Sequence, residues 1–124
     1  MKRVLVVDDE ERIQEVVQAC LEILYGWQVY TASSGTEALE QAKAHQPDAI
    51  LLDVSMPEMD GITLLQQLRS NPATAKIPVI LLTAKSHSLN QLEASDKISG
   101  KVSGLITKPF EPLKLAEQIM AILE

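Results

Sequence analysis

The sequence predicts an α/β fold in which a five-stranded parallel sheet is covered by helices on both faces. Five short apolar runs alternate along the chain with longer segments whose apolar residues recur every three or four positions. The short runs have the length of buried strands, and the longer segments have the period of helices. Strands that alternate with helices favour a parallel sheet, because a parallel pair needs a crossover connection between its strands.

The five apolar runs are predicted to be strands because they are short, apolar and bounded by polar or turn-forming residues. The expected strands are Arg3 to Val7, Val29 to Ala32, Ala49 to Leu52, Val79 to Leu82, and Leu105–Ile106. The run at 29–32 is less apolar than the others.

The first two helices follow from apolar spacing and from residues that favour helix ends. The predicted inward face of the first helix comprises Ile13, Val16, Val17, Cys20, Leu21 and Leu24. Gly26 is placed to end this helix. Ser34 is placed to cap a second helix, with Glu37 three residues further on. The apolar residues expected to face inward from the second helix are Ala38, Leu39 and Ala42.

Three further helices complete the prediction. Leu64, Leu65 and Leu68 indicate a third helix, and the segment from Lys85 to Ser103 is expected to be a fourth with an irregular exit. Pro112 suits the first turn of a fifth helix. The apolar face of that helix comprises Leu115, Ala116, Ile119, Met120 and Leu123. We therefore expect residues 1–124 to form one domain of five strands and five helices.

Composition restricts the classes of function. The formal net charge of −6 argues against nucleic acid as a direct partner, because binding to a phosphate backbone needs a clustered positive surface. No apolar run approaches the roughly 18 residues that span a membrane. The single cysteine, Cys20, cannot form an internal disulfide. These features predict a cytoplasmic protein that binds neither membrane nor nucleic acid.

Polar side chains follow four of the predicted strands. The first strand leads into Asp8 and Asp9, the third into Asp53, the fourth into Thr83 and the fifth into Lys108. In open parallel sheets, ligands bind beyond the carboxyl ends of the strands. Three carboxylates, a hydroxyl and an ammonium group are therefore expected at one edge of the sheet.

Crowded carboxylates repel one another, so such a site favours a bound cation. Mg²⁺ prefers oxygen ligands and usually takes one or two carboxylates together with water and phosphate. A carboxylate can also act as a nucleophile toward phosphorus, and Asp53 is the best-placed acid because its strand should be central. Glu10 and Glu11 are interpreted instead as a solvated helix start stabilised by the helix dipole.

Five short segments carry a recognisable pattern: Val-Val-Asp-Asp-Glu at 6–10, Leu-Leu-Asp at 51–53, Met-Pro-Glu-Met-Asp-Gly at 56–61, Leu-Thr-Ala at 82–84 and Lys-Pro-Phe at 108–110. In these segments the chain resembles the receiver domain of bacterial two-component response regulators, along almost its whole length. Their order and spacing make the match specific. The resemblance implies a flavodoxin-like, doubly wound sheet with strand order 2-1-3-4-5.

The resemblance also implies a role for each site residue. Asp53 would accept a phosphoryl group from a sensor histidine kinase, a phosphotransfer protein or a small acyl phosphate. The Mg²⁺ ligands would be Asp8, Asp9, Asp53 and the backbone carbonyl of Ser55. Thr83 and Lys108 would contact the phosphoryl oxygens. The domain would catalyse only its own phosphorylation and dephosphorylation.

We expect the output to be contact with a downstream protein through the fourth helix, the last strand and the fifth helix, because the chain ends at its last predicted helix. The family usually has an aromatic residue three positions before the lysine, where this chain has Leu105. The stretch from Thr83 to Lys108 is also longer than the resemblance leads us to expect. Both departures concern how the switch is transmitted.

Three alternatives remain at this point. A pseudo-receiver would bind partners without phosphorylation, although the complete acidic set argues against it. A flavin-binding electron carrier would need a Gly/Ser/Thr-rich phosphate loop after the first strand, where this chain has acids. A phosphatase with an aspartate nucleophile normally has an Asp-x-Asp arrangement after the first strand, whereas Asp8 and Asp9 are adjacent.

Overall fold

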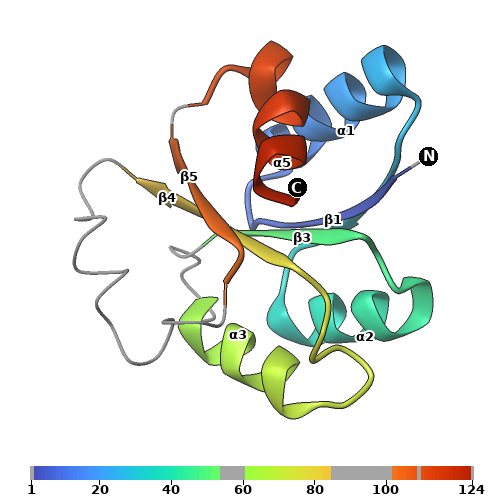
Figure 1. The fold of residues 1–124 in the computed structure, drawn as a ribbon, viewed down its shortest axis with the longest axis vertical. Coiled ribbons are helices and arrows are strands. Elements are labelled where there is room, and N and C mark those ends of the chain that lie inside the picture. The colour runs from blue at the N-terminus through green and yellow to red at the C-terminus, as the bar shows by residue number, and fades with distance from the viewer. Residues whose placement is uncertain (1, 54–60, 85–101, 109, 124) are drawn as a thin grey trace.

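The computed structural model describes residues 2–53, 61–84, 102–108 and 110–123, which form a parallel sheet between two layers of helices (Figure 1). The strands are β1 (Arg3–Val7), β2 (Gln28–Ala32), β3 (Ala49–Asp53), β4 (Val79–Ala84) and β5 (Gly104–Lys108). The helices are α1 (Glu11–Tyr25), α2 (Gly35–His45), α3 (Gly61–Ser70) and α5 (Leu115–Leu123), with a 3₁₀ turn η1 (Pro112–Lys114) before α5. The helix predicted between Lys85 and Ser103 falls mainly on residues 85–101, which lie outside the described residues.

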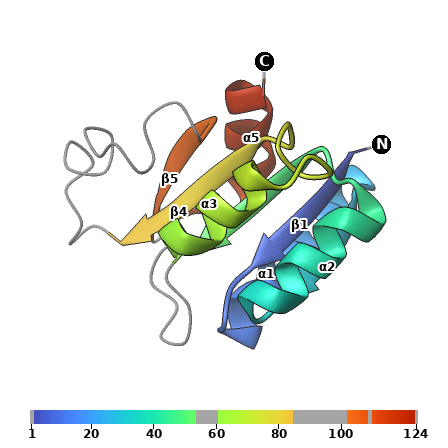
Figure 2. The same cartoon turned by 90° about the horizontal axis from the view of Figure 1, so that it is seen from below.

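The strand order is β2-β1-β3-β4-β5, and every neighbouring pair is parallel. This confirms the predicted α/β class and the order 2-1-3-4-5. Helices α1 and α5 cover one face of the sheet, whereas α2 and α3 cover the other (Figures 1 and 2). β3 is the middle strand, so its carboxyl end lies at the centre of the sheet edge.

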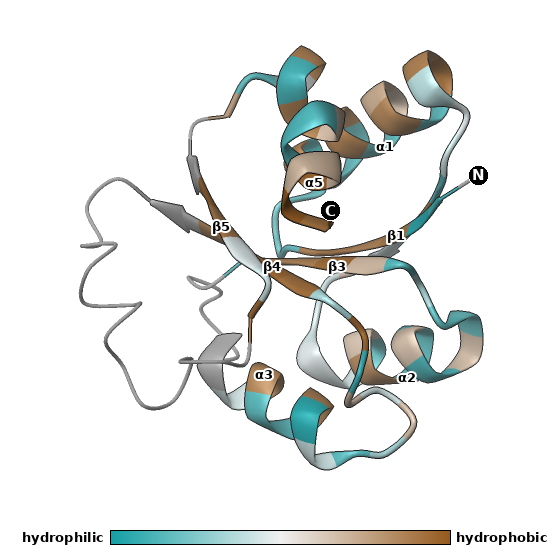
Figure 3. Ribbon diagram, in the orientation of Figure 1, coloured by the Kyte–Doolittle hydropathy of each residue, from teal (hydrophilic) through white to brown (hydrophobic). Residues whose placement is uncertain are grey.

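The core lies on both faces of the sheet, and alternate strand residues supply each half. Leu5 and Val7 of β1 belong to the cluster beneath α2 and α3, while Val4 and Val6 belong to the cluster beneath α1 and α5. The interiors of β1, β3 and β4 are therefore apolar, as the brown parts of these strands in Figure 3 show. This double burial is the reason that the strands read as continuous apolar runs in the sequence.

The predicted ends of the first two helices are confirmed. Gly26 has the left-handed φ of 68°, and its N–H donates to the carbonyl of Glu22. Only glycine adopts this conformation without a steric penalty from Cβ. At the start of α2, the Ser34 hydroxyl accepts a hydrogen bond of 3.2 Å from the N–H of Glu37.

Two details of the predicted helices were wrong. Val16 and Leu24, expected to face inward, are exposed. The buried face of α1 consists of Gln14, Val17 and Leu21, which lie at spacings of three and four. Val16 lies off this face, whereas Leu24 continues its spacing but stands in the last turn, one residue before the helix ends at Tyr25. Pro112 begins η1 rather than the α-helix itself, since the chain enters α5 through a tighter turn.

Candidate functional site

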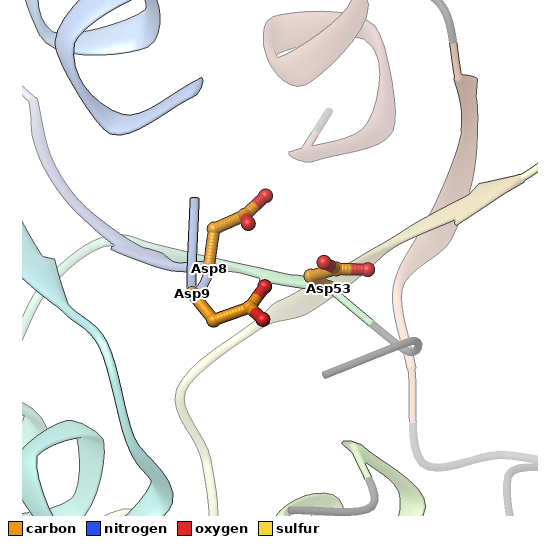
Figure 4. Close-up of side chains that lie close together, drawn as sticks. All are labelled: Asp8, Asp9 and Asp53. Atoms are coloured by element: carbon orange, nitrogen blue, oxygen red, sulfur yellow. The ribbon is translucent and has the colours of Figure 1, made fainter. Parts of the chain in front are cut away.

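Asp8, Asp9 and Asp53 meet at the carboxyl edge of the sheet (Figure 4). Asp8 directly follows β1, and Asp53 is the last residue of β3. β1 and β3 are neighbours in a register that pairs Val7 with Leu52, so the next residues along the two strands are brought together. Each aspartate offers a carboxylate oxygen, and these three oxygens lie within 4.8 Å of one another. The convergence predicted from the strand ends is therefore present for all three carboxylates.

The three acids differ in their access to solvent. Asp8 is fully buried and Asp53 is 4% exposed, whereas Asp9 is exposed. Asp8 accepts a hydrogen bond of 2.9 Å at Oδ1 from the N–H of Glu10, which fixes its carboxylate within the loop between β1 and α1. Two carboxylates thus form the interior of the site, and the third stands at its opening.

Gln14 is a buried polar residue near the site that the sequence patterns missed. Its side-chain amide donates to the carbonyl oxygens of Asp8 and Ala32 and to the hydroxyl of Ser33. It lies three and seven residues before Val17 and Leu21, so the helical period could have placed it on the inward face. Because glutamine is usually exposed, the sequence pattern did not indicate that Gln14 belongs to the buried face of the helix.

Thr83 and Lys108 lie at the same edge of the sheet by strand register. Leu82 pairs with Asp53, so Thr83 is one residue beyond the level of the aspartate on the neighbouring strand. Thr83 pairs with Thr107, and Lys108 is the last residue of β5. For Thr83 and Lys108 the structure describes the backbone but not the side chain. Ser55 lies outside the described residues.

The donor set of the site fits Mg²⁺. All three groups are carboxylates, which are hard oxygen ligands, and octahedral coordination at about 2.1 Å places ligand oxygens roughly 3 to 4.2 Å apart. The three carboxylate oxygens lie within 4.8 Å of one another, which is close to that spacing. Asp9 is exposed, so one side of the site is open to water, and Mg²⁺ usually retains several water ligands. The residues present therefore suit this cation.

The family model of the response regulator receiver domain matches residues 4–120. The chain belongs to this family. The match spans β1 through most of α5 and includes all three carboxylates of the site. The resemblance inferred from the short motifs is therefore confirmed, and the receiver domain has the acidic triad that is typical of the Mg²⁺ site in this family.

Solved structures agree with this assignment. The receiver domain is similar to the chemotaxis protein CheY4 of Vibrio cholerae, with 30% identity, a TM-score of 0.86 and coverage of 98% of both chains. It is also similar to a CheY-like response regulator receiver domain protein from Methanospirillum hungatei, with 27% identity, a TM-score of 0.83 and coverage of 99% of this chain and 94% of that one. The flavodoxin-like fold is therefore shared with receivers of similar length.

Among curated proteins, the receiver domain is 42% identical over 125 residues to the alkaline phosphatase synthesis transcriptional regulatory protein PhoP of Bacillus subtilis. That alignment covers 98% of this chain and 48% of PhoP. The chain thus spans about half the length of the curated relatives it matches. Within the described residues, no helix has both the length and the apolar character needed to cross a membrane.

Proposed function

We propose that residues 1–124 form a receiver domain in which Asp53 accepts a phosphoryl group from the phosphohistidine of a sensor histidine kinase or phosphotransfer protein. The observation that supports this proposal best is the meeting of Asp8, Asp9 and Asp53 within 4.8 Å at the end of the central strand. A small acyl phosphate such as acetyl phosphate would serve as an alternative donor.

Asp53 is the acceptor in this proposal because of its position and burial. It ends β3, and its side chain leaves the same sheet face as Ala49 and Leu51, which α1 and α5 cover. A carboxylate oxygen of Asp53 forms a bond to phosphorus while the bond from phosphorus to the donor nitrogen or oxygen breaks. With acetyl phosphate the leaving group is acetate, so the step needs no further reactant.

The other residues would stabilise charge around the transferred group. Asp8, Asp9, Asp53 and the carbonyl of Ser55 would hold Mg²⁺, which when bound neutralises charge on the phosphoryl oxygens. The Thr83 hydroxyl would donate a hydrogen bond to one phosphoryl oxygen, and the Lys108 ammonium would pair with another. The backbone register that brings Thr83 beside Asp53 supports this division of roles.

The output of the switch would be a change in protein contacts. The surface that we propose for a downstream partner comprises β5, α5 and residues of the 85–101 segment, which lies outside the described residues. The net charge of −6 disfavours direct binding of this domain to nucleic acid. If the receiver is joined to a further domain, as the greater length of its transcriptional relatives suggests, that domain would be the first partner to test.

Mass spectrometry of the protein after treatment with acetyl phosphate and Mg²⁺ tests the proposal. We expect one added phosphoryl group, mapped to Asp53 after borohydride reduction, and none in the variant Asp53→Asn. Asp48→Asn is the matched control, because Asp48 immediately precedes β3 at the opposite edge of the sheet. That control should be phosphorylated as the wild type is.

Two results would count against the proposal. Phosphorylation of Asp53→Asn to the wild-type level would place the acceptor elsewhere. No phosphorylation of the folded wild type by acetyl phosphate or by a panel of histidine kinases would favour the pseudo-receiver alternative.

A further inference from the structure

The side chain of Gln14 forms hydrogen bonds that connect the carboxyl ends of β1 and β2 with the loop that contains Asp8 and Asp9. Its side-chain nitrogen Nε2 donates to the carbonyl oxygen of Asp8, to the carbonyl oxygen of Ala32 at 3.2 Å and to the hydroxyl of Ser33 at 3.0 Å. Gln14 is only 8% exposed. A primary amide has two N–H donors, so three acceptors around one nitrogen use its full donor capacity.

The contact with Asp8 acts on the peptide group that connects Asp8 to Asp9. The carbonyl oxygen of Asp8 belongs to that peptide plane, and a planar peptide transmits its orientation to the next Cα. The N–H of Asp8 donates to the carbonyl oxygen of Ala32 at 3.1 Å, and the Asp8 carboxylate accepts a hydrogen bond from the N–H of Glu10. Because Gln14 donates to the Asp8 carbonyl, hydrogen bonds hold the backbone of Asp8 at both its N–H and its C=O. These bonds fix the orientation of the peptide group that leads into Asp9.

We infer that Gln14 is a positioning residue for the metal site, acting through the Asp8–Asp9 peptide rather than by contact with the ion. The inference rests on the proposed function, because it assigns Gln14 a role in the same Mg²⁺ site. Asp9 is exposed, so packing restrains its side chain little, and its backbone must supply the restraint. Groups behind the direct ligands of a metal typically change its affinity about 10- to 100-fold when they are removed.

The variant Gln14→Met tests this role, because methionine matches the length of glutamine and lacks its N–H donors. The measurement is the Mg²⁺ dissociation constant of the unphosphorylated protein by isothermal titration calorimetry. The matched control is Thr74→Val, which also removes one buried hydrogen bond from a side chain to a backbone carbonyl, in the connection that precedes the amino end of β4. Both variants should lose stability, but only Gln14→Met should change the metal site.

We expect Gln14→Met to weaken Mg²⁺ binding about 10-fold or more, and Thr74→Val to stay within about twofold of the wild type. A second readout is the Mg²⁺ concentration that gives half the maximal rate of phosphorylation by acetyl phosphate. In Gln14→Met that concentration should rise by the same factor, while the rate at saturating Mg²⁺ falls less. A purely structural role would leave the two variants alike in both measurements.

Equal Mg²⁺ affinity in Gln14→Met and the wild type would overturn the inference, as would an equal loss in Thr74→Val. If Gln14→Met does not fold, Gln14→Asn takes its place, because it keeps the amide but is one methylene too short to reach all three acceptors. Gln14→Asn should then bind Mg²⁺ more weakly than Thr74→Val, and equal binding would overturn the inference. Failure of the wild type to bind Mg²⁺ would instead reject the proposed function, so the two failures are distinguishable.

Discussion

Gly104 of β5 lies against Ile122 of α5 so closely that the strand has no room for a side chain at this position. A Cβ atom on Gly104 would lie 2.8 Å from Cγ2 of Ile122 and 2.9 Å from its Cδ1 and Cγ1. These distances are shorter than a carbon–carbon contact of about 3.5 to 4.0 Å. The last helix therefore packs on the last strand through a glycine.

Gly104→Ala should destabilise the protein by about 1 to 3 kcal/mol, because the added methyl group forces the Ile122 side chain or α5 itself to shift. Urea unfolding measures this loss. Ile122→Ala removes the three atoms that the methyl group would meet. In the Ile122→Ala background, Gly104→Ala should then cost less than about 0.5 kcal/mol, which gives a clear coupling between the two positions. If the stability losses of the two substitutions are additive instead, contact with Ile122 is not what destabilises Gly104→Ala.

A second prediction concerns Thr74, in the connection between α3 and β4. Thr74 is fully buried, and its hydroxyl donates to the carbonyl of Leu68 at 2.6 Å. Thr74→Val keeps the shape but removes this donor, so it should destabilise the protein by about 1 to 3 kcal/mol. Thr74→Ser keeps the hydroxyl and should cost less, as measured by thermal or urea unfolding. A larger loss in the serine variant would show that methyl packing dominates at this position.

The last turn of α3, just before this connection, contains the partly buried Arg69. Burial lowers the pKa of the Arg69 guanidinium, because desolvation disfavours its charged form. Arg69 donates to the carbonyl oxygens of Thr74 at 3.4 Å and Ala75 at 3.0 Å. These acceptors offset part of the desolvation.

The architecture could be predicted from the sequence because the sheet is buried on both faces. Each central strand must then be apolar through its interior, and polar residues stand at its ends, as Arg3 does in β1 and Asp53 in β3. The helix ends at Gly26 and Ser34 were also predictable, since a left-handed φ and a side-chain cap each require a particular residue type.

The environment of the site was less predictable, because it depends on hydrogen bonds between distant parts of the chain. Gln14 contacts Ala32 and Ser33, which are 18 and 19 residues away, and no local pattern encodes those contacts. The outward position of Val16 has a related cause. Periodicity shows that α1 has an apolar side, but the sheet beneath the helix decides which part of that side is buried.

A third prediction is that Mg²⁺ stabilises the folded protein. A ligand that binds only the folded state adds RT ln(1 + [L]/Kd), which is about 1.4 kcal/mol at ten times the dissociation constant. Asp9→Asn should abolish most of this gain. Without Mg²⁺, the same variant should be as stable as the wild type or slightly more stable, because it removes one of three neighbouring negative charges.

Thermal unfolding with and without Mg²⁺ measures both effects, and Asp48→Asn serves as the control. Asp48 accepts a hydrogen bond from the N–H of Arg3 at 2.7 Å, and it lies at the amino edge of the sheet, away from the triad. This variant should retain the wild-type response to Mg²⁺. An equal response in Asp9→Asn would show that Mg²⁺ stabilises the protein through some other site.

The last prediction concerns Leu105, which stands where receivers usually have an aromatic residue. Leu105 is partly buried and packs against the apolar cluster between the sheet and helices α2 and α3. An aliphatic side chain has no polar end to place in water, and exposing it would cost about 25 cal/mol per Å² of apolar surface. A tyrosine could move between the two environments because it has both an apolar ring and a hydroxyl group.

When beryllofluoride binds with Mg²⁺ as a phosphoryl analogue, the methyl resonances of Leu105 should therefore shift little, while the amide resonance of Asp53 shifts strongly. The variant Leu105→Tyr should show a larger response at position 105 under the same conditions. Large methyl shifts at Leu105 in the wild type would instead mean that leucine takes part in the switch as an aromatic residue would.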